Sequence, residues 1–326
     1  WMIVAVGLFV AVIAWTEMTR PAGQPSSWTL LAQADRWLVL AALATLWASQ
    51  LPLMVIWLYL CRRAGLQGRR LDLLRTFSAM LLFGVLTPGR SGELAVPLMD
   101  RDNFGRLASV VVVNRVLGLI FTICLAIFVL MLVVGGVFAT GQGLLVLGLV
   151  VVFATVLSMV LYRPAVTWAV RLVFRLIGPL RRLPGFRTAF ALRPTVERGI
   201  DVFFDAVHNI IHWRGVAFIV LMLIAAHALA LAATWLVVRA VGQQYPFPLL
   251  VGAMATNSVA GFLLPLPGGM GGGEVLTKAL FEQYGRTPAG AFLILIRVMI
   301  FLVPMIYFLG VRLRGLLVGP AGREVD

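Results

Sequence analysis

Charged side chains are scarce in this sequence, because Asp, Glu, Lys and Arg together make up only 12% of its 326 residues. A soluble domain carries about 25% charged residues, so this composition excludes a soluble globular fold. Hydrophobic residues make up 61% of the chain, and its mean hydropathy is +0.99. Lysine is almost absent, since Lys278 is the only one, and arginine therefore supplies nearly all of the formal net charge of +14.

Cysteine is also rare. The two cysteines, Cys61 and Cys124, lie in or beside apolar segments, which predicts free thiols and no disulfide. The sequence also lacks a phosphate-binding loop, an HExxH motif, a GxSxG motif and a dinucleotide fingerprint between a strand and a helix. We therefore expect no cofactor, no ATP hydrolysis and no enzymatic activity of this chain.

Long apolar runs are abundant by contrast. Six segments are nearly free of charge, at 2–14, 37–60, 108–138, 144–161, 216–238 and 291–311. A helix needs about 20 apolar residues to cross a hydrocarbon core of about 30 Å. We therefore predict an all-α integral membrane protein with about six transmembrane helices. The first run is short, but the chain begins at Trp1 without an initiator methionine, which indicates that residues precede it.

The arginines gather in three loops, at 62–75, 163–198 and 312–323. A pI near 11.4 is compatible with nucleic-acid binding, but arginines confined to loops between apolar runs are typical of the positive-inside pattern. We therefore expect a bacterial cytoplasmic membrane protein with both termini in the cytoplasm and no nucleic-acid partner. Five basic residues then fall on the outer side: Arg20, Arg36, Arg239, Lys278 and Arg286.

The segment 163–214 is expected to be cytoplasmic and to hold an amphipathic helix. Acidic and histidine side chains recur on one face at helical spacing, with apolar side chains opposite. Two histidines four residues apart beside two aspartates also match the spacing of metal ligands. We favour the solvated face of an interfacial helix and expect no metal. The polar residues are Glu197, Asp201, Asp205, His208 and His212, and the apolar ones are Val202, Phe203, Val207, Ile210 and Ile211.

Two further apolar segments, 77–86 and 249–264, stop at clusters of proline and glycine. Proline removes an amide donor and glycine lowers helix preference, so each helix should break there. Broken backbone at membrane depth is tolerated only where protein buries it or a wet cavity solvates it. We therefore predict two re-entrant helical hairpins. Their break residues are Pro88, Gly89, Gly92, Pro265, Pro267, Gly268, Gly269 and Gly271.

The two predicted hairpins resemble copies of each other, within repeat halves at about 37–135 and 215–312. Each break is followed by a glutamate, by an aromatic-Gly-Arg step at 104–106 or 284–286, and by an apolar helix with an arginine inside it. Three crossings separate the hairpins, so they should enter from opposite faces. A duplicated broken helix in inverted orientation is typical of transporters, with the site near the midplane where the breaks meet.

The charges expected within the membrane are Arg90, Glu93, Arg115, Glu274 and Arg297. A central charge costs at least about 2.5–3.5 kcal/mol on insertion, so these groups need pairing, water or a ligand. Arginine binds phosphate in a bidentate manner, and helix N-termini add amide donors for an anion. We hypothesise a cavity for a lipid phosphate, in which the glutamates hold the arginines or exchange protons or cations. Asn114 and Asn257 are candidates for further hydrogen bonds.

A structural interpretation of the same residues stays open. A glutamate at a helix N-terminus is stabilising through the helix dipole alone. Glu93 and Glu274 are then caps of the helices that follow the breaks, and Arg115 and Arg297 are their salt-bridge partners. Arg90 is also placed to reach the cytoplasmic interface.

The break motifs resemble those of the flippase-like superfamily that includes the transmembrane part of lysylphosphatidylglycerol synthases and related stand-alone proteins. The matching motifs are Pro88-Gly89-Arg90-x-Gly92-Glu93 and Pro265-x-Pro267-Gly268-Gly269-x-Gly271-x-x-Glu274, with Gly285 following. Relatives commonly carry an arginine soon after the first glutamate, where this chain has Val96 and Pro97, so the headgroup contact made there is not expected here. The chain ends soon after its last apolar run, so a stand-alone member without the synthase domain is expected.

The resemblance implies movement of a lipid between leaflets, with a phospholipid, a polyprenyl-phosphate-linked lipid or a hopanoid-type lipid as substrate. Membrane lipids are the expected partners, and a homodimer and contacts with enzymes of a lipid pathway are compatible with the sequence. Three alternatives stay open: a secondary transporter of a small polar solute, a membrane-embedded enzyme acting on lipid phosphates, and a scaffold in a membrane pathway.

Overall fold

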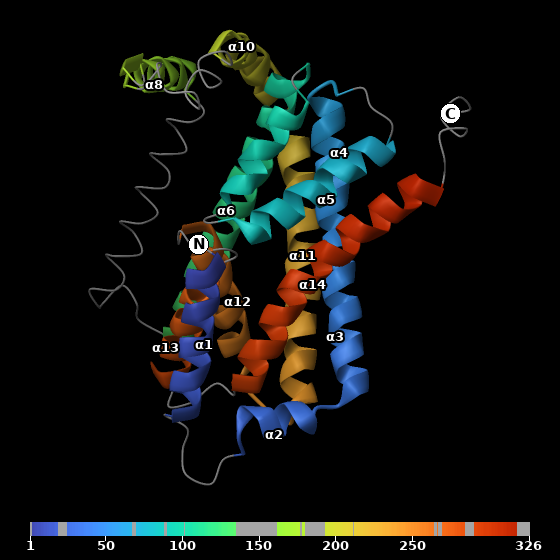
Figure 1. Ribbon diagram of the computed structural model, residues 1–326, viewed down its shortest axis with the longest axis vertical. Coiled ribbons are helices and arrows are strands. Elements are labelled where there is room, and N and C mark those ends of the chain that lie inside the picture. Colours follow the sequence, from blue (N-terminus) through green and yellow to red (C-terminus); the bar gives the residue numbers. More distant parts are fainter. Residues whose placement is uncertain are drawn as a thin grey trace.

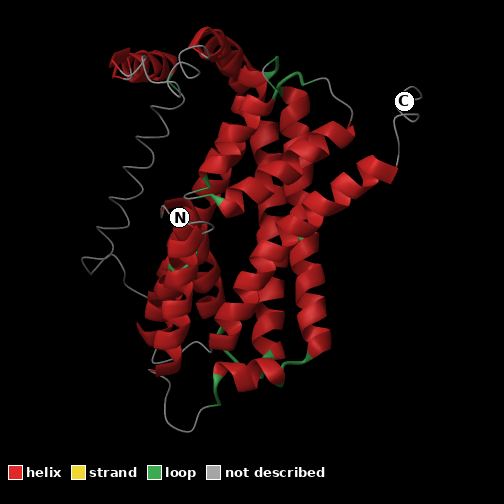
Figure 2. Ribbon diagram, in the orientation of Figure 1, coloured by secondary structure: helices red, strands yellow, loops and turns green. Residues whose placement is uncertain are grey.

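The computed structural model describes residues 2–18, 25–66, 70–87, 90–100, 102–134, 162–176, 178–179, 193–210, 212–263, 266, 269–283 and 290–317. The regular structure of these residues is helical throughout, without a strand (Figure 2). The all-α prediction is confirmed for this part of the chain.

Four helices of the described chain are long and apolar enough to cross a membrane, at Arg36–Arg63, Phe104–Leu125, Trp213–Ala240 and Gly290–Gly310. They belong to α3 (Arg36–Ala48) with α4 (Gln50–Arg63), α6 (Phe104–Val134), α11 (Trp213–Ala240) and α14 (Gly290–Leu317). The protein is therefore a multi-pass membrane protein. The predicted count of six crossings is not confirmed, because α1 (Met2–Met18) is 17 residues long and the run at 144–161 lies outside the described residues.

The bundle has two ends, marked by different short helices (Figure 1). Helices α8 (Arg163–Leu176) and α10 (Arg193–Ile210) lie at one end, and α2 (Ser27–Ala32) lies at the other. We call these the α10 end and the α2 end. The long helices α3 and α11 pack side by side between them.

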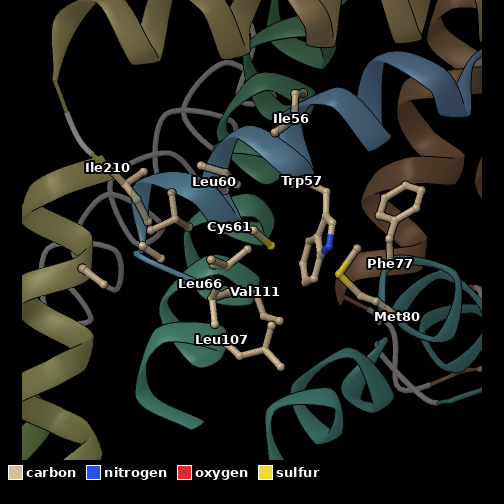
Figure 3. Close-up of a cluster of buried hydrophobic side chains, with 14 of the residues drawn as sticks. Ile56, Trp57, Leu60, Cys61, Leu66, Phe77, Met80, Leu107, Val111 and Ile210 are labelled. Atoms are coloured by element: carbon tan, nitrogen blue, oxygen red, sulfur yellow. The ribbon is translucent and has the colours of Figure 1, made fainter. Parts of the chain in front are cut away.

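A hydrophobic core at the α10 end joins α4, α5 (Arg70–Leu86), α6, α10 and α11. Trp57 of α4 is fully buried in it and lies beside Phe77 and Met80 of α5 (Figure 3). The Trp57 Nε1–H donates a hydrogen bond of 2.9 Å to the Leu73 carbonyl, which ties α4 to the first turns of α5. A second core gathers side chains of α1, α3, α11, α12 (Phe247–Leu263), α13 (Gly272–Gln283) and α14.

Exposed aromatic side chains mark both ends of the bundle. Trp28 and Trp37 lie at the α2 end with 67% and 75% of their surface exposed. Tyr162, Trp168 and Trp213 are exposed near the α10 end. Tryptophan and tyrosine prefer the level of the lipid headgroups, so these side chains fit the two interfaces of a bilayer.

The predicted amphipathic segment consists of the two helices α8 and α10. In α10, Glu197, Asp201, Asp205 and His208 are exposed, whereas Val207 and Ile210 are buried, as the helical spacing predicts. One prediction is wrong: His212 lies beyond the helix, where its ring contacts Tyr59 and Arg63. Val202, which the sequence places on the apolar face, is 40% exposed. His212 misses the α10 face because the helix ends at Ile210. Ile211 lies outside the described residues, and Phe203 is half-buried.

The helix before the first break is longer than predicted. The sequence places it at 77–86, but α5 begins at Arg70. Its first two turns carry the exposed side chains of Arg70, Asp72 and Arg75, and Arg75 Nη1 lies 2.9 Å from Asp72 Oδ1 there. The prediction placed the start of this helix at the start of the apolar run, and it therefore missed residues 70–76. The second prediction, 249–264, agrees closely with α12 at Phe247–Leu263.

Candidate functional site

The helices on either side of the second break, α12 and α13 (Gly272–Gln283), lie toward the α2 end (Figure 1). The carbonyl of Ala240, the last residue of α11, accepts a hydrogen bond of 2.9 Å from the Asp35 N–H, next to α2. From there α12 runs inward for 17 residues, about 25 Å, and α13 packs against it on the way back. Gly290, where α14 begins, lies against the Ser27 hydroxyl of α2. Helix α12 is therefore shorter than α11, which spans about 42 Å.

The segments that precede and follow the first break are joined at the α10 end. Arg106, in the first turn of α6, donates a hydrogen bond of 3.1 Å to the carbonyl of Gly65, just after α4. Between them α5 runs inward for 17 residues, and the 3-10 helix η1 (Ser91–Met99) follows the break. Helix α5 crosses the half of the bundle nearer α10, whereas α12 and α13 lie nearer α2 (Figure 1).

Left-handed backbone occurs at both breaks. Gly269 and Gly271 have φ angles of 69° and 82°, and Arg90 has a φ of 57°. Glycine adopts this conformation readily and other residues rarely do, so the glycines serve the turn as predicted, whereas Arg90 is held in an unfavourable region. The break residues Pro88, Gly89, Pro265, Pro267 and Gly268 lie outside the described residues.

The second break carries a buried ion pair between α13 and α14. Arg297 Nε donates a hydrogen bond of 2.5 Å to Glu274 Oε1, and Arg297 Nη2 contacts the same oxygen. The other oxygen, Glu274 Oε2, accepts a hydrogen bond of 2.7 Å from the Gly271 N–H. Only 4% of the Arg297 side chain and 1% of the Glu274 side chain are exposed. Both carboxylate oxygens are thus satisfied, one by the arginine and one by the backbone of the break.

Asn257 of α12 completes this second cluster. Its Oδ1 accepts a hydrogen bond of 3.3 Å from Arg297 Nη2, and its Nδ2 donates a hydrogen bond of 3.0 Å to the Thr277 hydroxyl of α13. Gly273 makes the close approach possible, because a Cβ there would lie 2.3 Å from Asn257 Oδ1. Sequence reasoning did not identify Thr277, although its position three residues after Glu274 puts both side chains on one face of α13.

The first break carries a cluster of two arginines and one glutamate. Arg90 Nε lies 2.5 Å from Glu93 Oε1, and Arg115 Nη1 lies 3.6 Å from Glu93 Oε2. Arg115 Nη1 also donates a hydrogen bond of 2.8 Å to the Arg90 carbonyl, which ties α6 to the break. Glu93 is buried, whereas the side chains of Arg90 and Arg115 keep 29% and 21% of their surface exposed.

Small and hydroxylic residues shape the first break. A Cβ at Gly84 of α5 would lie 2.5 Å from Glu93 Oε1, so only glycine lets the carboxylate pack against this helix. The Thr87 hydroxyl donates a hydrogen bond of 2.7 Å to the Phe83 carbonyl and accepts one of 2.6 Å from the Gly92 N–H. Sequence reasoning did not identify Gly84 or Thr87, although Thr87 directly precedes Pro88 and serine or threonine often satisfies broken backbone.

The predicted site residues therefore gather into two clusters, one at each break. Asn257 joins the second cluster as expected. Asn114 is half-buried on α6, and its side chain makes no hydrogen bond to either glutamate among the described residues. The predicted aromatic-Gly-Arg step at 104–106 opens α6, where Gly105 lies against Gly199 of α10. Its counterpart at 284–286 lies outside the described residues.

No group of three or more His, Cys, Asp or Glu side chains within the described ranges is arranged to hold a metal ion.

Lys278, which the sequence places among the basic residues of the outer side, is buried. It lies on α13 with none of its side chain exposed, and its Nζ is 3.4 Å from the centre of the Trp15 ring of α1. Glu282 Oε1 lies 3.6 Å from the same Nζ. Helix α1 therefore covers this lysine, a long-range contact that loop-based charge counting does not reveal.

We expect amine-reactive reagents to label Lys278 in the unfolded chain and only slowly in the folded one, because the ring of Trp15 covers its Nζ. Lys278 is the only lysine, so peptide mapping by mass spectrometry reads its labelling directly. Trp15→Ala is expected to accelerate the labelling, and exposed Trp28→Ala is the control. Equal labelling of the folded and unfolded chains contradicts the burial of Lys278.

Comparison with known proteins identifies a family. The family model described as the lysylphosphatidylglycerol synthase TM region matches residues 2–307, a range that contains both breaks and both charged clusters. No curated protein matches the chain, and no solved structure does. The resemblance found in the break motifs is thereby confirmed. This multi-pass membrane protein belongs to the lysylphosphatidylglycerol synthase TM region family.

Proposed function

We propose that the protein moves an amphipathic lipid with an anionic headgroup between the leaflets of a bacterial cytoplasmic membrane. The observation that carries the proposal is the pair of charged clusters at the two breaks, with Glu93 and Glu274 both buried. Charges within a membrane are costly and are usually retained for function. Membership in the family indicates a role in a lipid-related process, which favours a lipid over a solute.

In this proposal the two broken segments are re-entrant hairpins of an inverted repeat. The first enters from the α10 end and the second from the α2 end. Their contacts are reciprocal, because α5 packs against α14 and α12 packs against α6, so each hairpin lies on the helix that follows the other. Rocking of one half against the other then exposes the breaks to each side in turn.

In this proposal the arginines set the orientation of the protein in the membrane. The α10 end carries Arg62, Arg63, Arg106 and Arg214, together with the basic helix α8, whereas Arg36 and Arg239 lie at the α2 end. Positive charge in loops favours the cytoplasmic side, so the α10 end faces the cytoplasm in this proposal. A substrate headgroup bound at the first break therefore comes from the cytoplasmic half of the membrane.

The test is lipid movement in proteoliposomes, measured as the fraction of fluorescent phosphatidylglycerol that a membrane-impermeant quencher reaches over time. The intact protein is expected to accelerate movement above that of empty vesicles. Glu93→Gln and Arg115→Gln should slow it by about tenfold or more, since each removes at least one charge-assisted interaction. Arg163→Gln, which breaks the exposed pair with Asp201, is the matched control and should keep the full rate.

Each variant is first checked for folding by gel filtration and circular dichroism. No movement by the intact protein under any imposed proton or sodium gradient contradicts the proposal for phospholipids. Accelerated movement that Glu93→Gln and Arg115→Gln leave unchanged contradicts the role of the breaks.

A further inference from the structure

Helix α8 lies on the outside of the bundle, where it packs against α10 (Figure 1). Arg163 of α8 forms an ion pair with Asp201 of α10, and the guanidinium carbon of Arg193 lies 5.7 Å from the centre of the Phe174 ring. None of the α8 side chains that the structure describes is buried. The helix is therefore held at the edge of the protein, against α10.

The neighbours of α8 set its level relative to the membrane. Helix α10 packs tightly on α6, since a Cβ at Gly105 of α6 would lie 2.7 Å from the carbonyl oxygen of Gly199. Trp213 begins α11 three residues after the end of α10 and is 75% exposed, and tryptophan at the end of a crossing typically marks the lipid headgroups. The apolar run at 144–161, which the sequence predicts to be a crossing, ends directly before α8. These neighbours favour a position at the membrane surface, and α8 lies across the direction of the long helices (Figure 1).

The polar side of α8 is basic. The helix contains three arginines, Arg163, Arg171 and Arg175, and no acidic residue. Spacings of eight and four residues put the three on one side of the helix. Arg163 is paired with Asp201, whereas Arg171 and Arg175 are exposed and form no ion pair with another described residue. Two cationic side chains are therefore available to a negatively charged partner.

A row of large apolar side chains, Trp168, Leu172 and Leu176, follows another side of the same helix. Five residues separate Arg163 from Trp168, which corresponds to about 140° around the helix axis. Trp168 is 65% exposed and Leu176 is 67% exposed, so α10 leaves this side open. Contiguous exposed apolar side chains mark an interaction surface.

We propose that α8 lies in the lipid surface at the α10 end, with its apolar row at the level of the upper acyl chains and with Arg171 and Arg175 on anionic headgroups. Helices with a basic polar side and an apolar side rich in tryptophan and leucine lie in the plane of the membrane interface. A bilayer already surrounds the crossings next to α8, so the apolar row meets lipid unless a soluble protein displaces it. The inference goes beyond the proposed function and does not depend on lipid movement.

The test determines the surroundings of α8 in the full chain. Leu176→Cys and Trp168→Cys each place a fluorescent thiol label on the apolar row, and Asp205→Cys places it on the exposed side of α10 as the matched control. Cys61 is fully buried, so only Cys124 is first replaced by serine, and labelling of that parent gives the background. The proteins are placed in lipid nanodiscs, where water reaches both membrane surfaces. Quenching by nitroxide-labelled acyl chains is compared with quenching by aqueous iodide.

The labels at 168 and 176 are expected to be quenched mainly by the acyl-chain nitroxide, and the label at 205 mainly by iodide. Labels at 168 and 176 that iodide quenches as strongly as the label at 205 overturn the insertion of α8. Protection of these labels from both quenchers shows that protein covers the apolar row, which overturns the proposal as well.

The headgroup preference is measured with the label at 176 and the same nitroxide carried by phosphatidylglycerol or by phosphatidylcholine, each at a low and equal mole fraction. An arginine near the surface is expected to enrich the anionic lipid by about fivefold. Quenching by phosphatidylglycerol should therefore exceed quenching by phosphatidylcholine. Arg171→Gln combined with Arg175→Gln should remove the difference, whereas Arg36→Gln at the α2 end should keep it. Equal quenching by the two lipids in the chain that retains Arg171 and Arg175 overturns the contact with anionic headgroups.

Discussion

Replacing Arg297 by alanine is expected to lower the free energy of unfolding by about 3–5 kcal/mol, the typical cost of removing one partner from a buried ion pair. The loss leaves the Glu274 carboxylate 1% exposed without its cation, and it removes the donor to Asn257 Oδ1. Asn257 keeps its hydrogen bond to the Thr277 hydroxyl of α13 but loses its link to α14. The measurement is unfolding in mixed micelles with increasing denaturing detergent, followed by circular dichroism.

Two controls distinguish the effect of breaking a buried ion pair from the effect of simply removing an arginine. Arg163→Ala breaks an ion pair whose side chains are 58% and 64% exposed, and exposed pairs contribute about 0–1 kcal/mol. The double variant Arg297→Met with Glu274→Gln leaves no buried charge, so it should cost less than the sum of the two single variants. Equal destabilisation by Arg297→Ala and Arg163→Ala contradicts the stabilising role of the buried pair between Arg297 and Glu274.

The positions of the breaks are predictable from the sequence because they depend on local chemistry. Helix α5 ends at Leu86 and α12 at Leu263, each within two residues of a proline. Proline restricts the residue before it and removes an amide donor, and both effects act within a few residues. The pairing of each glutamate with the later arginine was one of two interpretations of the sequence, and the structure contains it at both breaks.

The remaining features depend on residues far apart in the chain. Lys278 is buried by Trp15, which lies on the first helix, and no local pattern brings the two together. The start of α5 at Arg70 was missed because the helix begins several residues before the apolar run from which it was predicted. The 3-10 conformation of η1 was missed as well, since the sequence predicted an α-helical N-terminus after each break.

The contact between Arg90 and Glu93 is the clearest case. The sequence presents Arg90 as a charge within the membrane that is also placed to reach the interface, and it pairs each glutamate with the later arginine. The structure turns Arg90 back onto Glu93 through its left-handed backbone. The pairing of Arg90 with Glu93 thus goes together with a left-handed φ angle at Arg90, which residue spacing does not encode.

Replacing Gly84 by alanine is expected to destabilise the protein by about 1–3 kcal/mol, the range for overpacking, although alanine normally stabilises a helix by about 1 kcal/mol over glycine. The added Cβ would lie 2.5 Å from Glu93 Oε1 and 2.9 Å from Glu93 Cγ, so the carboxylate must move away from α5. Because Glu93 holds both arginines, its displacement should also slow lipid movement. Thermal unfolding and the proteoliposome assay measure the two effects.

Gly118 of α6 is the matched control, because a Cβ there has no atom within 4 Å. Gly118→Ala should follow helix propensity alone and raise the melting temperature while it leaves lipid movement unchanged. The same substitution, in two helices of one bundle, is thus expected to have opposite signs, and the difference isolates the contact between Gly84 and Glu93. Stabilisation by Gly84→Ala equal to that by Gly118→Ala contradicts the packing of the carboxylate against α5, and with it the geometry from which the headgroup site is inferred.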